Sequence, residues 1–203
     1  MSGEPSMTKG ERREQEILRA AADLFFEKGF HATSLEDIAK VVGIRKSGLY
    51  YYSQTKDDLL FRVLQEGMQI MLDELQAICS SGDDPVEKLR RAVENHVRKI
   101  DTHSSTMGVI LREDRSVSPE RRESYLAMRD AYEELFRGVV REGVAAGVFR
   151  RCDPVLVTRA ILGMCGWLAV WYRPGGRLTP ASITAAFIEL ILRGLERRNT
   201  GSQ

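Results

Sequence analysis

The chain has 203 residues, with 30 lysines and arginines against 29 aspartates and glutamates, so its formal net charge is +1. This balance excludes a polycation and an acidic tail protein, and any nucleic-acid surface must therefore be local. Cys79, Cys152 and Cys165 lie far apart and leave an odd number, which favours buried thiols in a reducing compartment over a disulfide framework.

The first ten residues are polar and lack the apolar core of a signal peptide, so we expect a cytoplasmic protein. The longest uncharged run, residues 160–172, has thirteen residues. We expect that run to be too short for a helix that crosses a bilayer.

Helix signals recur along the chain and no segment alternates with a period of two, so we predict an all-α fold of about nine helices. Capping residues and glycine stops predict the first four, from Thr8 to Gly29, Ser34 to Gly43, about Arg45 to Tyr52, and Thr55 through Ile78. A proline directly after a capping residue marks four later starts, because the N–H that proline lacks has no partner at that position. These starts are Asp84-Pro85, Ser118-Pro119, Asp153-Pro154 and Thr179-Pro180, and a shorter helix is expected between Ser105 and Arg115.

Two short helices joined by Gly43-Ile44, inside a three-helix unit, have the outline of a helix-turn-helix. From Ala39 to Lys56 there are four basic residues and no acidic one, which gives a local positive surface for phosphates. We therefore predict an N-terminal arm and DNA-binding domain over residues 1–56 and a ligand-binding and dimerisation domain over residues 57–203.

Few side chains of the third helix are needed to bury it, so the others are predicted to face DNA. Arg45 and Lys46 can reach guanine O6 and N7, and Ser47 can donate to a base or a phosphate. Gly48 lets the backbone approach the groove, and the tyrosine hydroxyls that follow can bind phosphate oxygens. Lys56 and the free N–H groups at the start of the fourth helix offer another phosphate site. The alternative is plain packing of the tyrosines and a solvated face of lysines.

The segments Ala32–Ala39, Gly43-Ile44 and Gly48–Leu59 together resemble the DNA-binding head of the TetR family, at the spacing of that motif. The resemblance covers roughly the first sixty residues and implies that the partner is double-stranded operator DNA. It implies that phosphates are held by Ser34, Tyr51, Tyr52 and Lys56. It further implies that base edges or the adjacent backbone are met by Arg45, Lys46, Ser47, Gly48 and Tyr50.

The run 160–172 is apolar on all sides, as expected of a helix covered by its own chain on one side and by something else on the other. Because TetR relatives dimerise through their last two helices, the resemblance implies a homodimer formed in that way. Two copies would engage two half-sites of the operator. The alternative is a helix buried inside one monomer.

Residues 167–180 resemble the C-terminal domain of KstR-like and fatty-acid regulators within the same family, whose ligands are commonly acyl-coenzyme A thioesters. We therefore expect a small-molecule effector of that class in a mostly apolar pocket, with no cofactor and no metal site. Side chains that could converge on the pocket are Met128, Tyr132, Phe136, Met164, Trp167 and Trp171. A basic cluster of Arg112, Arg115, Arg121 and Arg122 could meet the phosphates of the coenzyme.

These features predict a ligand-responsive repressor that binds palindromic operator DNA as a homodimer and is released by its effector. One alternative is an all-α enzyme acting on an acyl thioester, but His31, His96 and His103 show none of the spacings that make a nucleophile or metal site. The other is a DNA-binding dimer without an effector, which a fully packed body without a cavity would favour.

Overall fold

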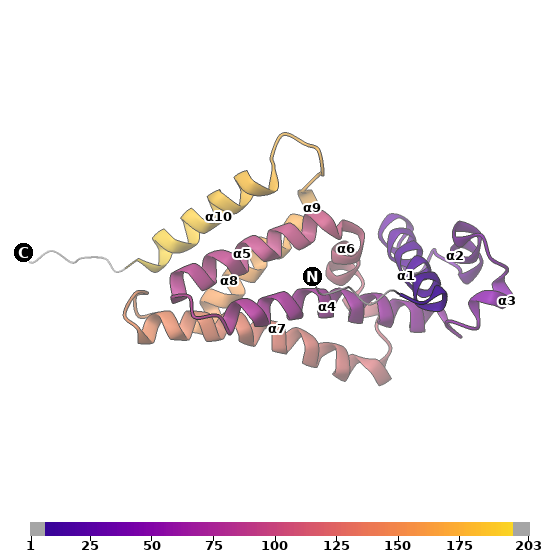
Figure 1. Ribbon diagram of the computed structural model, residues 1–203, viewed down its shortest axis with the longest axis horizontal. Helices are drawn as coiled ribbons and strands as arrows, with labels where there is room; N and C mark the ends of the chain where they lie inside the picture. Colours follow the sequence, from indigo (N-terminus) through magenta and orange to yellow (C-terminus); the bar gives the residue numbers. More distant parts are fainter. Residues whose placement is uncertain (1–6, 197–203) are drawn as a thin grey trace, which may run out of the picture.

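The computed structural model describes residues 7–196, which form ten α-helices and one 3₁₀-helix without any strand (Figure 1). The prediction of an all-α fold is confirmed. In chain order the elements are α1 (Lys9–Lys28), α2 (Leu35–Val42), α3 (Lys46–Leu49), α4 (Lys56–Cys79), α5 (Pro85–Thr102), α6 (Ser104–Arg112), η1 (Asp114–Ser116), α7 (Pro119–Ala145), α8 (Pro154–Gly166), α9 (Leu168–Trp171) and α10 (Pro180–Leu195).

The predicted helix starts coincide with observed N-caps. Complete capping boxes, in which the cap and the third helical residue exchange hydrogen bonds, form at Thr8, Ser34, Thr55 and Thr179. Asp84 and Asp153 cap helices that open with proline, whereas Ser118 precedes a proline without making a side-chain cap. Local chemistry therefore fixes where most of the helices begin.

Two helices differ from the expectation. The α-helical part of the third helix ends at Leu49, and the chain continues in tight turns in which the Tyr52 N–H donates to Leu49 O at 2.9 Å. The single apolar helix expected after Asp153 is divided at Trp167 into α8 and α9. The spacing of apolar residues cannot locate such breaks, because the backbone continues in tight helical turns on both sides of them.

The head of the molecule, residues 7–55, is a three-helix unit in which α1 packs on α2 and α2 packs on α3. Its interior is formed by large side chains that are almost fully buried, among them Ile17, Phe25, Ile38 and Leu49. The long helix α4 starts beside α1 and continues into the body, where it runs alongside α7 (Figure 1). The predicted domain boundary at residue 56 therefore falls on the first residue of a helix that contacts both parts.

The body is a helical bundle of α4, α5 and α7, with α8 against α7 and α10 against α5. Helix α6 contacts α1, α4 and α5, and thus lies between head and body (Figure 1). Its approach to α4 depends on Gly67, where a Cβ would lie 2.7 Å from Ile110 Cδ1. A side chain at that position would push the two helices apart.

Large apolar side chains are exposed on α8 and α10, where Leu156 is 65% and Leu190 64% exposed, and at the end of α8, where Trp167 is 60% exposed. The 18 residues Pro154–Trp171 have a mean hydropathy of 1.5, with 22% of them buried, which is long and apolar enough to cross a membrane by length and composition alone. The expectation of a segment too short to cross a bilayer therefore holds for the uncharged run 160–172, but not for the longer segment Pro154–Trp171. The inner face of α8 packs on α7, so one side of α8 is already covered by the chain.

Candidate DNA-binding and effector sites

The surface around α3 presents the polar side chains that the sequence predicted to face DNA. Leu49, 1% exposed, anchors α3 to the head, while the four residues 45–48 before it are all exposed. Tyr51 is 86% exposed, and its ring lies edge-on to that of Tyr52 with centroids 5.2 Å apart. Within residues 7–196 the cations of Arg45 and Lys46 form no ion pair, so their charge is open to solvent.

The turn between α2 and α3 depends on Gly43, whose φ of 73° lies in the left-handed region that favours glycine. The turn is closed by the Ile44 N–H, which donates to Ala39 O at 2.9 Å. Ile44 itself is half-buried against the head core. The backbone of the turn therefore orients α3 with its polar face outward.

Ser34 and Lys56, both predicted to hold phosphates, also have structural partners. The Ser34 hydroxyl accepts from the Asp37 N–H at 3.1 Å and donates to the Asp37 carboxylate at 2.7 Å. The Lys56 ammonium donates to Phe30 O at 2.8 Å and to His31 O at 3.2 Å, and lies over the Phe30 ring. The sequence did not predict this second role, in which the Lys56 side chain joins the start of α4 to the turn that follows α1.

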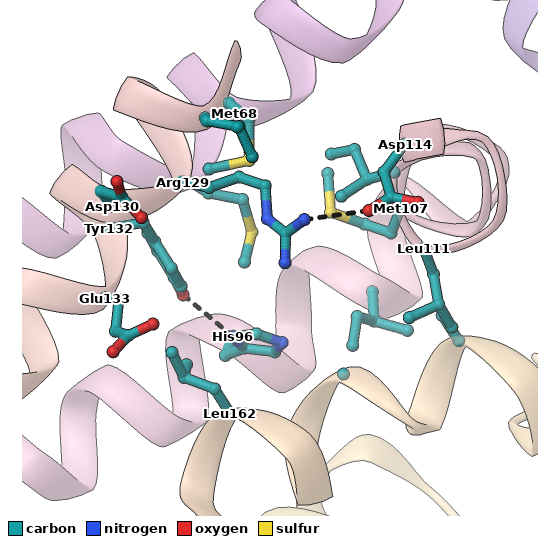
Figure 2. Close-up of a pocket in the computed structure, with 16 residues that line it drawn as sticks. Met68, His96, Met107, Leu111, Asp114, Arg129, Asp130, Tyr132, Glu133 and Leu162 are labelled. Atoms are coloured by element: carbon teal, nitrogen blue, oxygen red, sulfur yellow. Dashed lines mark hydrogen bonds and ion pairs between the residues drawn. The ribbon is translucent and has the colours of Figure 1, made fainter. Parts of the chain in front are cut away.

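A cavity of about 400 Å³ lies in the body, lined by residues of every element from α4 to α9 (Figure 2). Much of its wall is apolar and flexible, including Met68, Met71 and Met107. A concave, mostly apolar cavity with a few polar groups is the usual form of a small-molecule site. A fully packed body, which would have favoured the alternative of a DNA-binding dimer without an effector, is not what the described residues form.

Two polar pairs interrupt the apolar wall (Figure 2). His96 Nδ1 and the Tyr132 hydroxyl lie 2.9 Å apart, both buried. Burial lowers the pKa of His96 to about 4 and raises the pKa of Tyr132 well above 10, so both are neutral near pH 7. The second pair is ionic: Arg129 donates to Asp114 Oδ2 at 3.0 Å.

Of the six predicted pocket residues, only Tyr132 belongs to the cavity wall. Phe136 lies behind it with ring centroids 5.5 Å apart, and Met128 and Met164 are half-buried elsewhere against the core. Trp167 and Trp171 are 60% and 38% exposed. Apolar spacing marks a helix face but cannot tell a cavity wall from solid core or from an outer surface.

Some of the cavity residues that sequence reasoning missed lie on helices not considered for the pocket, and others lie on α7 and α8 beside the predicted ones. Met68 and Met71 belong to α4, and His96 belongs to α5. A histidine on the apolar face of a predicted helix, with valines at 93 and 97 beside it, was an available signal.

The predicted arginine cluster is instead divided among contacts within the chain. Arg112 lies over the Phe26 ring at 4.8 Å from its centroid, and Arg121 pairs with Asp58. Arg122 donates to Asp114 O at 3.2 Å. Of the four arginines, Arg115 alone is exposed without such a contact within residues 7–196.

A helix-turn-helix head joined to a helical body with a mostly apolar cavity between its helices defines a ligand-responsive, DNA-binding regulator rather than an enzyme. Residues 17–63 match the model of bacterial regulatory proteins of the tetR family, and residues 82–195 match the tetracyclin repressor-like C-terminal domain. The transcriptional repressor KstR2 of Rhodococcus jostii is 31% identical over 185 residues, covering 90% of this chain and 91% of that protein. The chain belongs to the TetR family of transcriptional regulators.

Solved structures of the same family are similar over nearly the whole fold. PfmR of Thermus thermophilus is 38% identical, with a TM-score of 0.83, covering 89% of this chain and 99% of the other. AibR, solved with isovaleryl coenzyme A and operator DNA, is 28% identical, with a TM-score of 0.82 over 88% and 97% of the two chains. The family likeness thus extends through head and body.

Proposed function

We propose that this regulator binds a palindromic operator as a homodimer and is released from it by an acyl-coenzyme A thioester. The observation that carries the proposal is the combination of an apolar cavity in the body with an exposed cationic surface at residues 45–51, which forms no ion pair within residues 7–196. A small molecule in the cavity could then control the DNA-binding surface through α4 and α6, which contact both parts. The proposal includes a cytoplasmic location, where chromosomal DNA and coenzyme A thioesters are both available.

On the DNA side, α3 would enter the major groove as the recognition helix. Bases or adjacent backbone would be contacted by Arg45, Lys46, Ser47, Gly48 and Tyr50, and phosphates by Ser34, Tyr51, Tyr52 and Lys56. The exposure of residues 45–48 and of Tyr51 supports this assignment. For Lys56 the contribution would be limited to the one ammonium proton that Phe30 and His31 leave free.

The dimer would form through the outer faces of α8 and α10. The exposed Leu156, Trp167 and Leu190 give these faces a composition that favours burial, since each large apolar side chain gains about 1.5–3 kcal/mol when removed from water. Dimerisation would also account for the high hydropathy of Pro154–Trp171 without a membrane. Trp167 and Trp171 are thus assigned to this face rather than to the pocket.

The effector is proposed from the cavity and from the family. The acyl chain would lie among the methionines, and the neutral His96–Tyr132 pair would offer a hydrogen bond to an uncharged oxygen such as the thioester carbonyl. AibR, solved with isovaleryl coenzyme A, provides a family precedent for this ligand class. A cavity of about 400 Å³ is at the small end of ligand sites, which favours short or medium acyl chains.

The test is release of the dimer from DNA upstream of its own gene by coenzyme A thioesters of graded chain length, followed by mobility shift. Lys46→Ala and Tyr51→Phe should lose DNA binding while sedimentation still shows a dimer. Unchanged binding by both variants would contradict the assignment of the DNA-binding surface. No release by any thioester would contradict the assignment of the effector.

A further inference from the structure

We propose that the effector presents an anionic group that replaces Asp114 as the partner of Arg129, and that this exchange weakens the contact through which the neighbouring residues Arg112 and Glu113 hold the head. The inference rests on the proposed function. It adds the chemistry of the effector group and the residues that couple the two sites.

The head side of this junction is formed by the end of α6. Arg112 lies over the Phe26 ring, and Glu113 Oε1 accepts from the Phe30 N–H at 3.1 Å. Phe30 is buried in the turn that follows α1, and its carbonyl accepts from the Lys56 ammonium of α4. Residues 112 and 113 therefore bind the point where α1 and α4 meet.

The cavity side is formed by the next residue, Asp114, which lines the cavity and pairs with Arg129. Figure 2 shows the Arg129 guanidinium projecting between Met68 and Met107, with Asp114 at the cavity edge. Among the described residues that line the cavity Arg129 is the single cation, and it belongs to the long helix α7. Three consecutive residues thus contact the head on one side and the cavity cation on the other.

Motion at the junction cannot be absorbed within α6. At Gly108 the Phe26 ring of α1 fills the space that a Cβ would take, and at Gly67 the space is filled by Ile110 and Thr106 of α6. Close-packed contacts of this kind transmit displacement rather than absorb it. A shift of η1 and the end of α6 would therefore move α1.

The ion pair is weak enough to exchange. The side chains of Arg129 and Asp114 are 47% and 25% exposed, and exposed pairs contribute about 0–1 kcal/mol. Of the other two carboxylates in the wall, Glu133 is already paired with Arg137, and Asp130 is exposed. An anion held in place by an apolar chain in the cavity can therefore compete with Asp114 for the guanidinium.

The ligand chemistry is tested with four probes that share one chain: octanoic acid, octanoyl-coenzyme A, octan-1-ol and octylamine. Calorimetric titration of the full-length protein should show that at least one of the anions, carboxylate or phosphate, binds with an affinity at least about tenfold higher than that of the alcohol. Comparison of octanoic acid with octanoyl-coenzyme A shows whether the preferred anion is a carboxylate or a phosphate. Equal binding of octan-1-ol, preference for octylamine, or no binding of either anion would overturn the inference.

Two variants break the same ion pair from opposite ends. Arg129→Gln should weaken binding of the preferred anion about tenfold, because the ligand loses its partner. Asp114→Asn should strengthen that binding, because the competing carboxylate is gone. If the ion pair were only structural, both substitutions would change the affinity for the anion in the same direction. That result would overturn the proposed exchange.

Coupling to the head is measured by hydrogen exchange of the peptide that contains the Phe30 amide. The bound anion should speed exchange there, Glu113→Ala should do so without ligand, and the matched variant Glu113→Gln, which keeps an acceptor oxygen, should not. Unchanged protection on saturation would overturn the coupling. None of these measurements uses DNA. If the protein bound no operator, the proposed function would be rejected, but the binding and exchange measurements would still decide this inference.

Discussion

Replacing Tyr132 by phenylalanine should destabilise the fold, whereas the same change at Tyr125 should not. Both tyrosines belong to α7 and are buried, at 5% and 1% exposure. The Tyr132 hydroxyl is the hydrogen-bond partner of His96 Nδ1, while within residues 7–196 the Tyr125 hydroxyl has no partner. The two substitutions remove the same atom from similar surroundings and differ mainly in that one hydrogen bond.

The magnitude follows from what each substitution leaves behind. Tyr132→Phe leaves a buried imidazole nitrogen unpaired, which should lower the free energy of unfolding by about 1–3 kcal/mol. Tyr125→Phe removes a hydroxyl that is desolvated without compensation, so its effect should be neutral or stabilising by up to about the same amount. The ring of Tyr125, which lies 6.0 Å from the Arg129 guanidinium, is kept in the variant.

The assay is urea unfolding at one fixed protein concentration, without effector, because unfolding of a dimer depends on concentration. Equal losses of stability in the two variants would refute the reasoning. So would a larger loss for Tyr125→Phe, since that would require a partner for its hydroxyl.

Three further outcomes are expected. Because burial lowers the pKa of His96 from 6.5 to about 4, the folded state binds fewer protons than the unfolded state between these pH values. Roughly 3 kcal/mol of the free energy of unfolding should therefore be lost as the pH falls from 6.5 to 4. A His96→Phe variant that lost the same amount over that pH range would contradict this. Leu190→Asp should yield monomers in sedimentation, whereas the matched change at exposed Val148 should leave the dimer, and a dimer in both variants would contradict the α8–α10 interface. Lys46→Ala should weaken operator binding while leaving the slope of log operator affinity against log salt nearly unchanged, because Lys46 is assigned to bases, and a slope reduced by about 1 would contradict that assignment.

Most helix starts were predictable from sequence because they are set by local chemistry. Thr8, Ser34 and Thr55 each form the capping box that their spacing indicates, and Gly43 adopts the left-handed conformation that ends α2. The exposed face of α3 was predictable for a related reason, since a short helix with one buried leucine leaves its remaining side chains outward.

The cavity was not predictable in the same way. Its wall combines residues of α4, α5 and α7, and their convergence depends on how whole helices pack. Phe136 and Trp167 both have the spacing of an inward face, yet one lies in the solid core and the other at the surface. Spacing along a helix specifies a face but not its neighbour.

The double roles of Lys56 and Asp114 were hidden for a similar reason. Their contacts with Phe30 and Arg129 join segments 26 and 15 residues apart, and no pattern within one helix specifies such pairs. Charge alone favoured phosphate contacts for the neighbouring arginines, whereas tertiary packing uses Arg112 to join α6 to α1 and Arg121 to join α7 to α4.

The central claim, that cavity and operator surface are thermodynamically coupled, is tested most directly by a closed binding cycle. Operator affinity is measured with and without saturating octanoyl-coenzyme A, and the affinity for octanoyl-coenzyme A is measured with and without saturating operator. The account predicts that each ligand weakens the other by the same factor, as linkage requires. Identical affinities for the thioester on free and operator-bound dimer would contradict it.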